Sequence, residues 1–142
     1  MDQVCNYALL RFMPCRDADE FVNVGVAVVC EESALLDYRL ETQNPARLSI
    51  FFPNLDVSDY QSGALALGAE IDRWKMEAAN PQSADVTPRR AFCELTRRRE
   101  GVFAFGPTRT LLSANPANVA EDMFQRYVRP GANLNVPTTP GG

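Results

Sequence analysis

Side chains that could bind a ligand gather on one face of the first three predicted strands. Residues 4–13, 20–31 and 34–41 are rich in β-branched and aromatic residues and are separated by polar turns. This pattern predicts an antiparallel meander with the second strand in the middle. Successive side chains of a strand point to opposite faces of the sheet. The odd-numbered positions carry the polar side chains Arg11, Asn23, Asp37, Arg39 and Glu41.

Short turns between these strands would bring the polar residues together as a ligand-binding face. If the first hairpin closes before Glu20, Arg11 lies opposite Asn23, and the second hairpin places Glu41 opposite Asn23. Gly25, whose missing side chain leaves room, follows in the next row. Arg11 would donate to Asn23 or to a carboxylate, and could hold a small anion or a peptide carboxylate. A solvated ladder of ion pairs on a half-exposed sheet accounts for the same residues, so both interpretations stay open.

The even-numbered positions of the strands are apolar and are expected to form the core. Val22, Val24, Val26 and Val28 share this parity. They should face the predicted helix over 57–78, whose apolar stripe from Tyr60 to Trp74 has helical spacing. A tight turn at Glu32–Ser33 should join the second and third strands. The same registers place Leu9, Gly25 and Arg39 in one row.

The rest of the chain is predicted to add helices and two short strands. Thr87-Pro88 is typical of a helix start and predicts a helix over 88–99. Residues 102–106 and 109–113 have the composition of strands, and Asn115-Pro116 opens a last helix. The predicted fold class is α+β, with an antiparallel three- to five-stranded sheet and helices packed mainly on one face.

Length and composition fit one small domain. The chain has 142 residues, 46% of them hydrophobic and 23% charged, so we expect a single domain over 1–128. Residues 129–142 are rich in Gly, Pro, Asn and Thr and predict a disordered tail. No apolar run approaches the roughly 20 residues of a membrane span, and the N-terminal residues lack a signal peptide. We therefore expect a cytoplasmic protein.

Metal and cofactor chemistry find little support in the sequence. The chain has no His, and its four Cys contain no CxxC pair, so zinc is not expected and the thiols should stay reduced. Asp17, Asp19 and Glu20 could hold Mg²⁺ in the first turn, but Asp is common in turns for its local hydrogen bonds. We predict no metal and no cofactor.

One spacing matches a phosphatase motif. Cys93 and Arg99 have the C-x5-R spacing of a thiolate nucleophile and a phosphate clamp. The segment lacks the glycines that let backbone N–H groups surround an anion, and it lies in a predicted helix. We therefore expect no phosphatase activity, and the sequence favours a non-enzymatic role over an enzyme.

Six arginines form the only basic concentration of the sequence. They are Arg89, Arg90, Arg97, Arg98, Arg99 and Arg109. Such residues can serve internal or solvated ion pairs, an acidic protein partner, or the phosphates of a nucleic acid. The net charge of −4 and the lack of interleaved aromatic residues favour a protein partner over a nucleic acid. We expect no tight DNA or RNA binding at physiological salt.

The first two strands resemble a known family. Tyr7-Ala-Leu-Leu-Arg11-Phe-Met-Pro14, followed by Glu20-Phe-Val-Asn23-Val-Gly25-Val, is similar to the opening of a bacterial family called domain of unknown function 3037. The resemblance implies a small bacterial domain, often encoded near HipA-like kinases. It points again to Arg11, Glu20, Asn23 and Gly25, and it implies no catalytic residues.

These observations leave three functions open. The leading hypothesis is a non-enzymatic interaction or accessory module, with a HipA-like kinase or a toxin–antitoxin-like system as partner. The second is a domain or enzyme that binds a small anion or small ligand at the Arg11, Asn23 and Glu41 face. The third is a nucleic-acid-associated protein that uses the arginines of residues 89–109.

Overall fold

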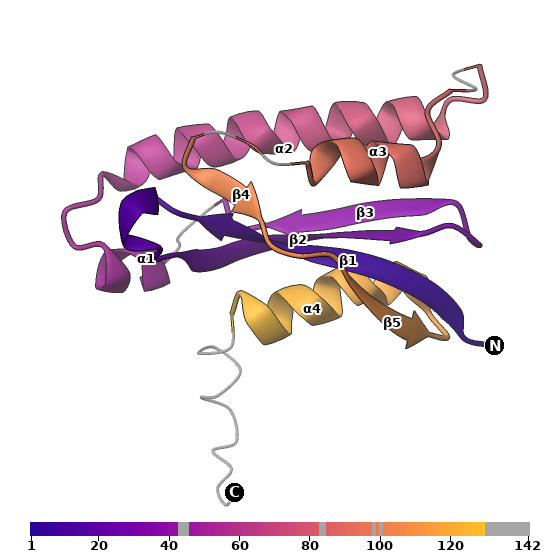
Figure 1. Ribbon diagram of the computed structural model, residues 1–142, viewed down its shortest axis with the longest axis horizontal. Helices are drawn as coiled ribbons and strands as arrows, with labels where there is room; N and C mark the ends of the chain where they lie inside the picture. The colour runs from indigo at the N-terminus through magenta and orange to yellow at the C-terminus, as the bar shows by residue number, and fades with distance from the viewer. Residues whose placement is uncertain (43–45, 83–84, 98, 100, 130–142) are drawn as a thin grey trace, which may run out of the picture.

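An antiparallel sheet with helices on both faces forms the α+β fold of this protein (Figure 1). The structure is a computed structural model. It describes residues 1–42, 46–82, 85–97, 99 and 101–129. The predicted tail, 129–142, lies outside the described residues except for Arg129. Within the described part of the chain, no helix has the length and apolar character needed to cross a membrane.

Five described strands make up the sheet, in the order β3-β2-β1-β4, with β5 also paired to β1. The second half of β1 pairs with β4 and the first half with β5, so these two short strands share one edge of β1. All pairings are antiparallel, as expected. The strands are β1 (Gln3–Phe12), β2 (Val22–Cys30), β3 (Leu35–Leu40), β4 (Phe103–Phe105) and β5 (Arg109–Ser113).

Side-chain caps mark the starts of the helices that begin at Val57 and Pro88. Asp56 accepts a hydrogen bond from the Ser58 N–H at 3.0 Å, and Thr87 accepts one from the Arg90 N–H at 3.1 Å. Both caps satisfy a backbone donor that the first helical turn leaves free. The helices are α1 (Ala46–Phe51), α2 (Val57–Ala79), α3 (Pro88–Leu95) and α4 (Val119–Tyr127), with short 3₁₀ turns at η1 (Arg16–Ala18) and η2 (Pro116–Asn118).

A β-bulge interrupts the register of β1 with β2. Arg11 pairs with Asn23, but its neighbour Leu10 pairs with Gly25. Val24 is therefore an extra residue in β2, and the alternation of side chains changes at this point. The predicted alternation holds on only one side of the bulge.

The bulge corrects the predicted core face. Val22 and Val24 pack toward α2 and α3, but Val26 and Val28 belong to a second apolar cluster with α4. The prediction that all four valines face helix 57–78 is therefore wrong for Val26 and Val28. In Figure 1, α2 and α3 lie on one side of the sheet and α4 lies on the other.

The β2–β3 pairing differs by one residue from the predicted row. Residues 31–34 form the turn, and Ala34 has a φ of 53°. This loop is two residues longer than the predicted turn at Glu32–Ser33, but both are centred between residues 32 and 33. Both therefore pair Gly25 with Leu40, as observed, rather than with Arg39. The predicted row of Leu9, Gly25 and Arg39 is wrong, and Leu9 pairs with Val26.

Candidate functional site

Arg11 and Asn23 are cross-strand neighbours, as the sequence predicted. They lie on the face of the sheet opposite α2, because their neighbours Leu10, Phe12 and Val24 pack toward α2. The Nε atom of Arg11 and the Oδ1 atom of Asn23 are both buried and have no hydrogen-bond partner among the described residues. The expected hydrogen bond between these side chains is therefore wrong, although their placement is right.

Glu41 lies beyond the end of β3 and outside the predicted row. Its N–H donates to the Val24 carbonyl at 2.8 Å, so it continues the ladder opposite the bulge rather than opposite Asn23. Its carboxylate is 6% exposed and accepts from Arg129 Nε and Nη2 at 2.7 and 2.9 Å. These hydrogen bonds raise the pKa of Arg129. The pair links the end of α4 to the sheet.

Gly25 takes a position that the sequence did not predict. A Cβ on Gly25 would lie 2.7 Å from the Arg39 carbonyl and 3.4 Å from the Leu10 side chain. The missing side chain therefore makes room on the α2 side, and the expected space beside the polar face is wrong. Glu20 is exposed in the segment that precedes β2.

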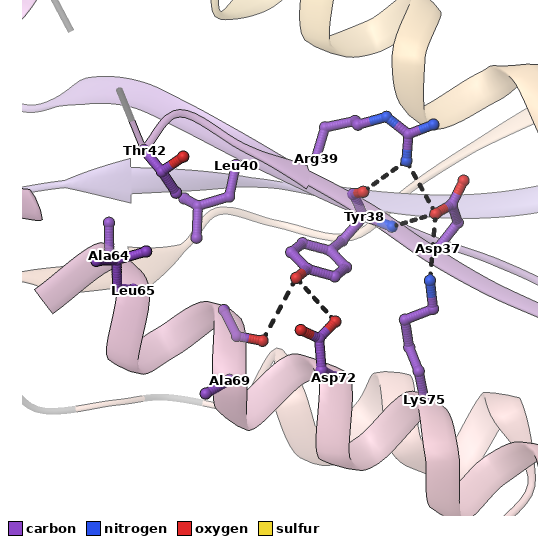
Figure 2. Close-up of a pocket in the computed structure, with 11 residues that line it drawn as sticks. Asp37, Tyr38, Arg39, Leu40, Thr42, Ala64, Leu65, Ala69, Asp72 and Lys75 are labelled. Carbon is purple, nitrogen blue, oxygen red and sulfur yellow. Dashed lines mark hydrogen bonds and ion pairs between the residues drawn. The ribbon is translucent and has the colours of Figure 1, made fainter. Parts of the chain in front are cut away.

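A groove of about 490 Å³ lies between β3 and α2 (Figure 2). Leu40 and Thr42 line one wall, and small or apolar residues of α2 line the other: Ala64, Leu65, Gly68 and Ala69. A Cβ on Gly68 would lie 3.6 Å from the Tyr38 hydroxyl, so the helix approaches the strand closely there. This groove was not predicted from the sequence. The spacing of Ala64 and Gly68 was the available signal, because residues four apart share one helix face.

Charged side chains close one end of this groove (Figure 2). The Tyr38 hydroxyl donates to Asp72 at 2.9 Å, and Lys75 lies 3.6 Å from the Asp37 carboxylate. Burial and the Asp72 carboxylate raise the pKa of Tyr38 to about 12. The hydroxyl therefore stays protonated and acts as a hydrogen-bond donor at neutral pH.

The outer edge of β3 borders the groove. Because Glu41 N–H bonds to β2, the alternation of an antiparallel ladder turns the backbone groups of Tyr38 and Leu40 outward. At Tyr38 both groups are occupied: its N–H donates to Asp37 at 2.9 Å and its carbonyl accepts from Arg39 at 2.8 Å. No such side chain covers Leu40 within the described part of the chain. The edge is thus blocked at its middle and open beside the groove.

The predicted partner-binding arginines differ in their surroundings. Arg98 lies outside the described residues, Arg90 donates to a carbonyl of the preceding loop, and Arg109 is exposed on β5. The other three are paired with carboxylates: Arg89 with Glu31, Arg97 with Glu94, and Arg99 with Glu70. Much of their charge is therefore balanced within the domain, and their role toward a partner stays a prediction.

The described residues contain no group of three or more His, Cys, Asp or Glu side chains placed to hold a metal ion. Asp17 and Asp19 are exposed in the first turn. Cys93 is exposed on α3, which agrees with the predicted helix rather than with a phosphate-binding loop. Burial raises the pKa of Cys5 to about 11, so this thiol is a poor nucleophile at neutral pH.

Residues 7–128 match the family model described as Protein of unknown function (DUF3037). The chain belongs to this family. The match covers both strands of the resemblance noted in the sequence, and it extends through α4. A search of curated proteins and a search of solved structures each found no match. Evidence on the role of this DUF3037 domain therefore comes from its own geometry.

Proposed function

We propose that this DUF3037 domain is a non-enzymatic interaction module that binds an extended segment of a partner protein in the groove between β3 and α2. The observation that carries the proposal is the open backbone edge at Leu40, which borders a groove of about 490 Å³. An extended peptide can add to such an edge through main-chain hydrogen bonds, while its side chains enter the neighbouring groove.

The chemistry of the groove defines the segment it would accept. Leu65 is 62% exposed and would be covered by an apolar side chain, which gains about 25 cal/mol per Å² of apolar surface removed from water. Because α2 approaches β3 closely at Gly68, only a small side chain of the segment fits there. At the closed end, Lys75 and Asp72 can pair with polar groups of the same segment.

Strand addition is confined to one end of the edge. Asp37 and Arg39 occupy the outward backbone groups of Tyr38, so a partner strand cannot pair along the whole of β3. This arrangement protects the edge from unspecific pairing, as charged side chains do on many edge strands. A short docked segment of a few residues is therefore expected rather than a full additional strand.

A HipA-like kinase is the partner that we propose to test first, because the family resemblance implies one as a genomic neighbour. Isothermal titration calorimetry of the domain against a HipA-like kinase should give saturable binding. Leu65→Asp should weaken this binding at least tenfold, since it places a charge in the apolar part of the groove. Met76→Asp is the matched control, because Met76 is 73% exposed on the same helix but does not line the groove.

A second measurement locates the contact without relying on the variants. On titration with the kinase, the backbone amides of Leu40 and Thr42 should show large chemical-shift changes. If Leu65→Asp and Met76→Asp lose affinity for the kinase equally, the kinase does not bind in the groove. Absence of any binding would overturn the kinase as partner, and peptides selected from a randomised library would then test the groove itself.

A further inference from the structure

We propose that this domain holds a second binding site, for a small oxyanion such as a phosphate or a carboxylate, in a cavity at the free edge of β4. The site is distinct from the groove between β3 and α2, and it does not depend on the function proposed above. Its central residue is Arg11, whose side chain reaches the cavity from the middle of the sheet.

The Arg11 guanidinium is held in place by contacts on two sides. Its carbon atom lies 4.1 Å from the centre of the Phe21 ring, a distance at which a cation is attracted to an aromatic face. A Cβ on Gly106 would lie 3.0 Å from the same carbon and 3.0 Å from Nη2. The guanidinium thus lies between the Phe21 ring and the backbone of Gly106, and a side chain at Gly106 would have to push it aside by a few tenths of an ångström.

This orientation leaves two polar atoms without partners. Arg11 and Asn23 are neighbours in the ladder, and a guanidinium turned toward Asn23 could donate to its Oδ1. Instead Arg11 Nε and Asn23 Oδ1 are buried and unpaired among the described residues. Buried polar atoms in proteins are nearly always paired, and each exception calls for an explanation, such as a functional role or a bound ion. The side chain is therefore positioned for the cavity rather than for an internal hydrogen bond.

Two further arginines make the cavity strongly positive. The cavity has a volume of about 450 Å³, and the described residues that line it include Arg11, Arg16 and Arg99 but no carboxylate. Arg16 donates to the carbonyls of Arg99 and Gly101, and thereby holds the segment before β4. Arg99 pairs with Glu70, which offsets one charge, so a positive excess remains for an anion.

The chemistry of the three side chains selects the ligand class. A guanidinium binds carboxylate or phosphate oxygens through parallel hydrogen bonds, which a Lys ammonium cannot form. The volume admits a small molecule or the charged end of a larger one. Arg11 comes from β1, Arg16 from η1 and Arg99 from the segment after α3. The site thus forms only in the folded domain.

Titration with inorganic phosphate, pyrophosphate and acetate, followed by NMR amide shifts, tests the proposal. At least one anion should give saturable shifts at Ala104 and Gly106, and the strongest of the three identifies phosphate or carboxylate as the class. Arg11→Lys keeps the charge but removes the paired donors, and Gly106→Ala displaces the guanidinium. Each should weaken binding at least tenfold.

Matched variants distinguish anion binding in this cavity from nonspecific attraction of anions to the charge of the protein. Arg109→Lys changes an exposed arginine outside the cavity, and Gly68→Ala adds a Cβ where the nearest atoms are 3.6 Å away or more. Both should bind as the wild type does. Thermal unfolding of each variant without anion checks that the fold is intact. Absence of saturable shifts with all three anions, or equal weakening in Arg11→Lys and Arg109→Lys, would overturn the proposal.

Discussion

The two faces of the sheet differ in whether their polar groups have hydrogen-bond partners. On the face toward α2, the Tyr38 hydroxyl donates to Asp72 and the Tyr60 hydroxyl donates to the Glu41 carbonyl. On the opposite face, Arg11 and Asn23 hold buried atoms that no described residue pairs with. The hydroxyls of the first face are thus paired within the chain, whereas two buried polar atoms of the second have no partner among the described residues.

The opposite face is itself divided in two. Beneath α4 it is apolar, with Val26, Val28 and Cys30 packed against Val119 and Phe124. Beyond the bulge, the same face carries Arg11 and Asn23. A single β-bulge thus separates an apolar half, which packs against α4, from a polar half that carries Arg11 and Asn23. Substitutions on the two sides of the bulge should therefore have very different effects.

The largest expected effect comes from placing a carboxylate in the packed half. Val26 is 2% exposed beneath α4, so Val26→Asp buries an unpaired charge and should lower the free energy of unfolding by about 4 kcal/mol or more. Asn23→Asp is the matched change on the same strand and face. It should cost no more than about 1 kcal/mol, because the Arg11 guanidinium lies in the same row and attracts the charge. Urea unfolding measures the free energy of unfolding of both variants. An equal decrease in the two would contradict the division of this sheet face into an apolar and a polar half.

A smaller effect of opposite sign is expected in the polar half. Asn23→Leu replaces a buried acceptor that has no partner with an apolar side chain of similar size. The free energy of unfolding should rise by about 1 kcal/mol, since an unpaired buried polar group is unfavourable. The same urea experiment measures it. A decrease of similar size would mean that Asn23 stabilises the fold, and the functional interpretation of its unpaired oxygen would then fail.

The division explains which parts of the structure the sequence could predict. Arg11 and Asn23 were placed correctly, because the first hairpin obeys simple pairing up to the bulge. Beyond it, alternation assigned Val26 and Val28 to the wrong face, since one extra residue reverses every later side chain. Two signals were available: Gly25 inside a strand often marks a bulge, and the unbroken apolar run after it indicates burial on both faces.

The rest of the candidate sites depends on contacts that no local pattern encodes. The groove forms because Gly68 of α2 lies beside Tyr38 of β3, and the cavity forms because Gly106 lies beside the Arg11 guanidinium. These pairs are brought together by the packing of distant segments. The β2–β3 register, by contrast, follows from the centre of the turn over residues 31–34, which is also the centre of the predicted turn at Glu32–Ser33.

The smallest expected effect concerns the paired face and appears only at alkaline pH. Burial and Asp72 raise the pKa of Tyr38 from 10.0 to about 12 in the folded protein. Below pH 10 the hydroxyl is protonated in both the folded and the unfolded chain, so its stabilising contribution is fully present. Between pH 10 and 12 the unfolded chain releases this proton more readily than the folded one. The contribution is therefore lost as the pH rises through this window.

Comparison of the wild type with Tyr38→Phe isolates this contribution, because Tyr60 and Cys5, whose pKa values burial also raises, are common to both proteins. Their free energies of unfolding should differ by a constant amount between pH 7 and 9. The difference should narrow as the pH rises from 10 toward 12, since only the wild type loses the Tyr38 hydrogen bond there. If the free energies of unfolding differ by a constant amount up to pH 12, the Tyr38 hydroxyl does not donate to Asp72. The contrast between the two faces in the pairing of their polar groups would then be smaller.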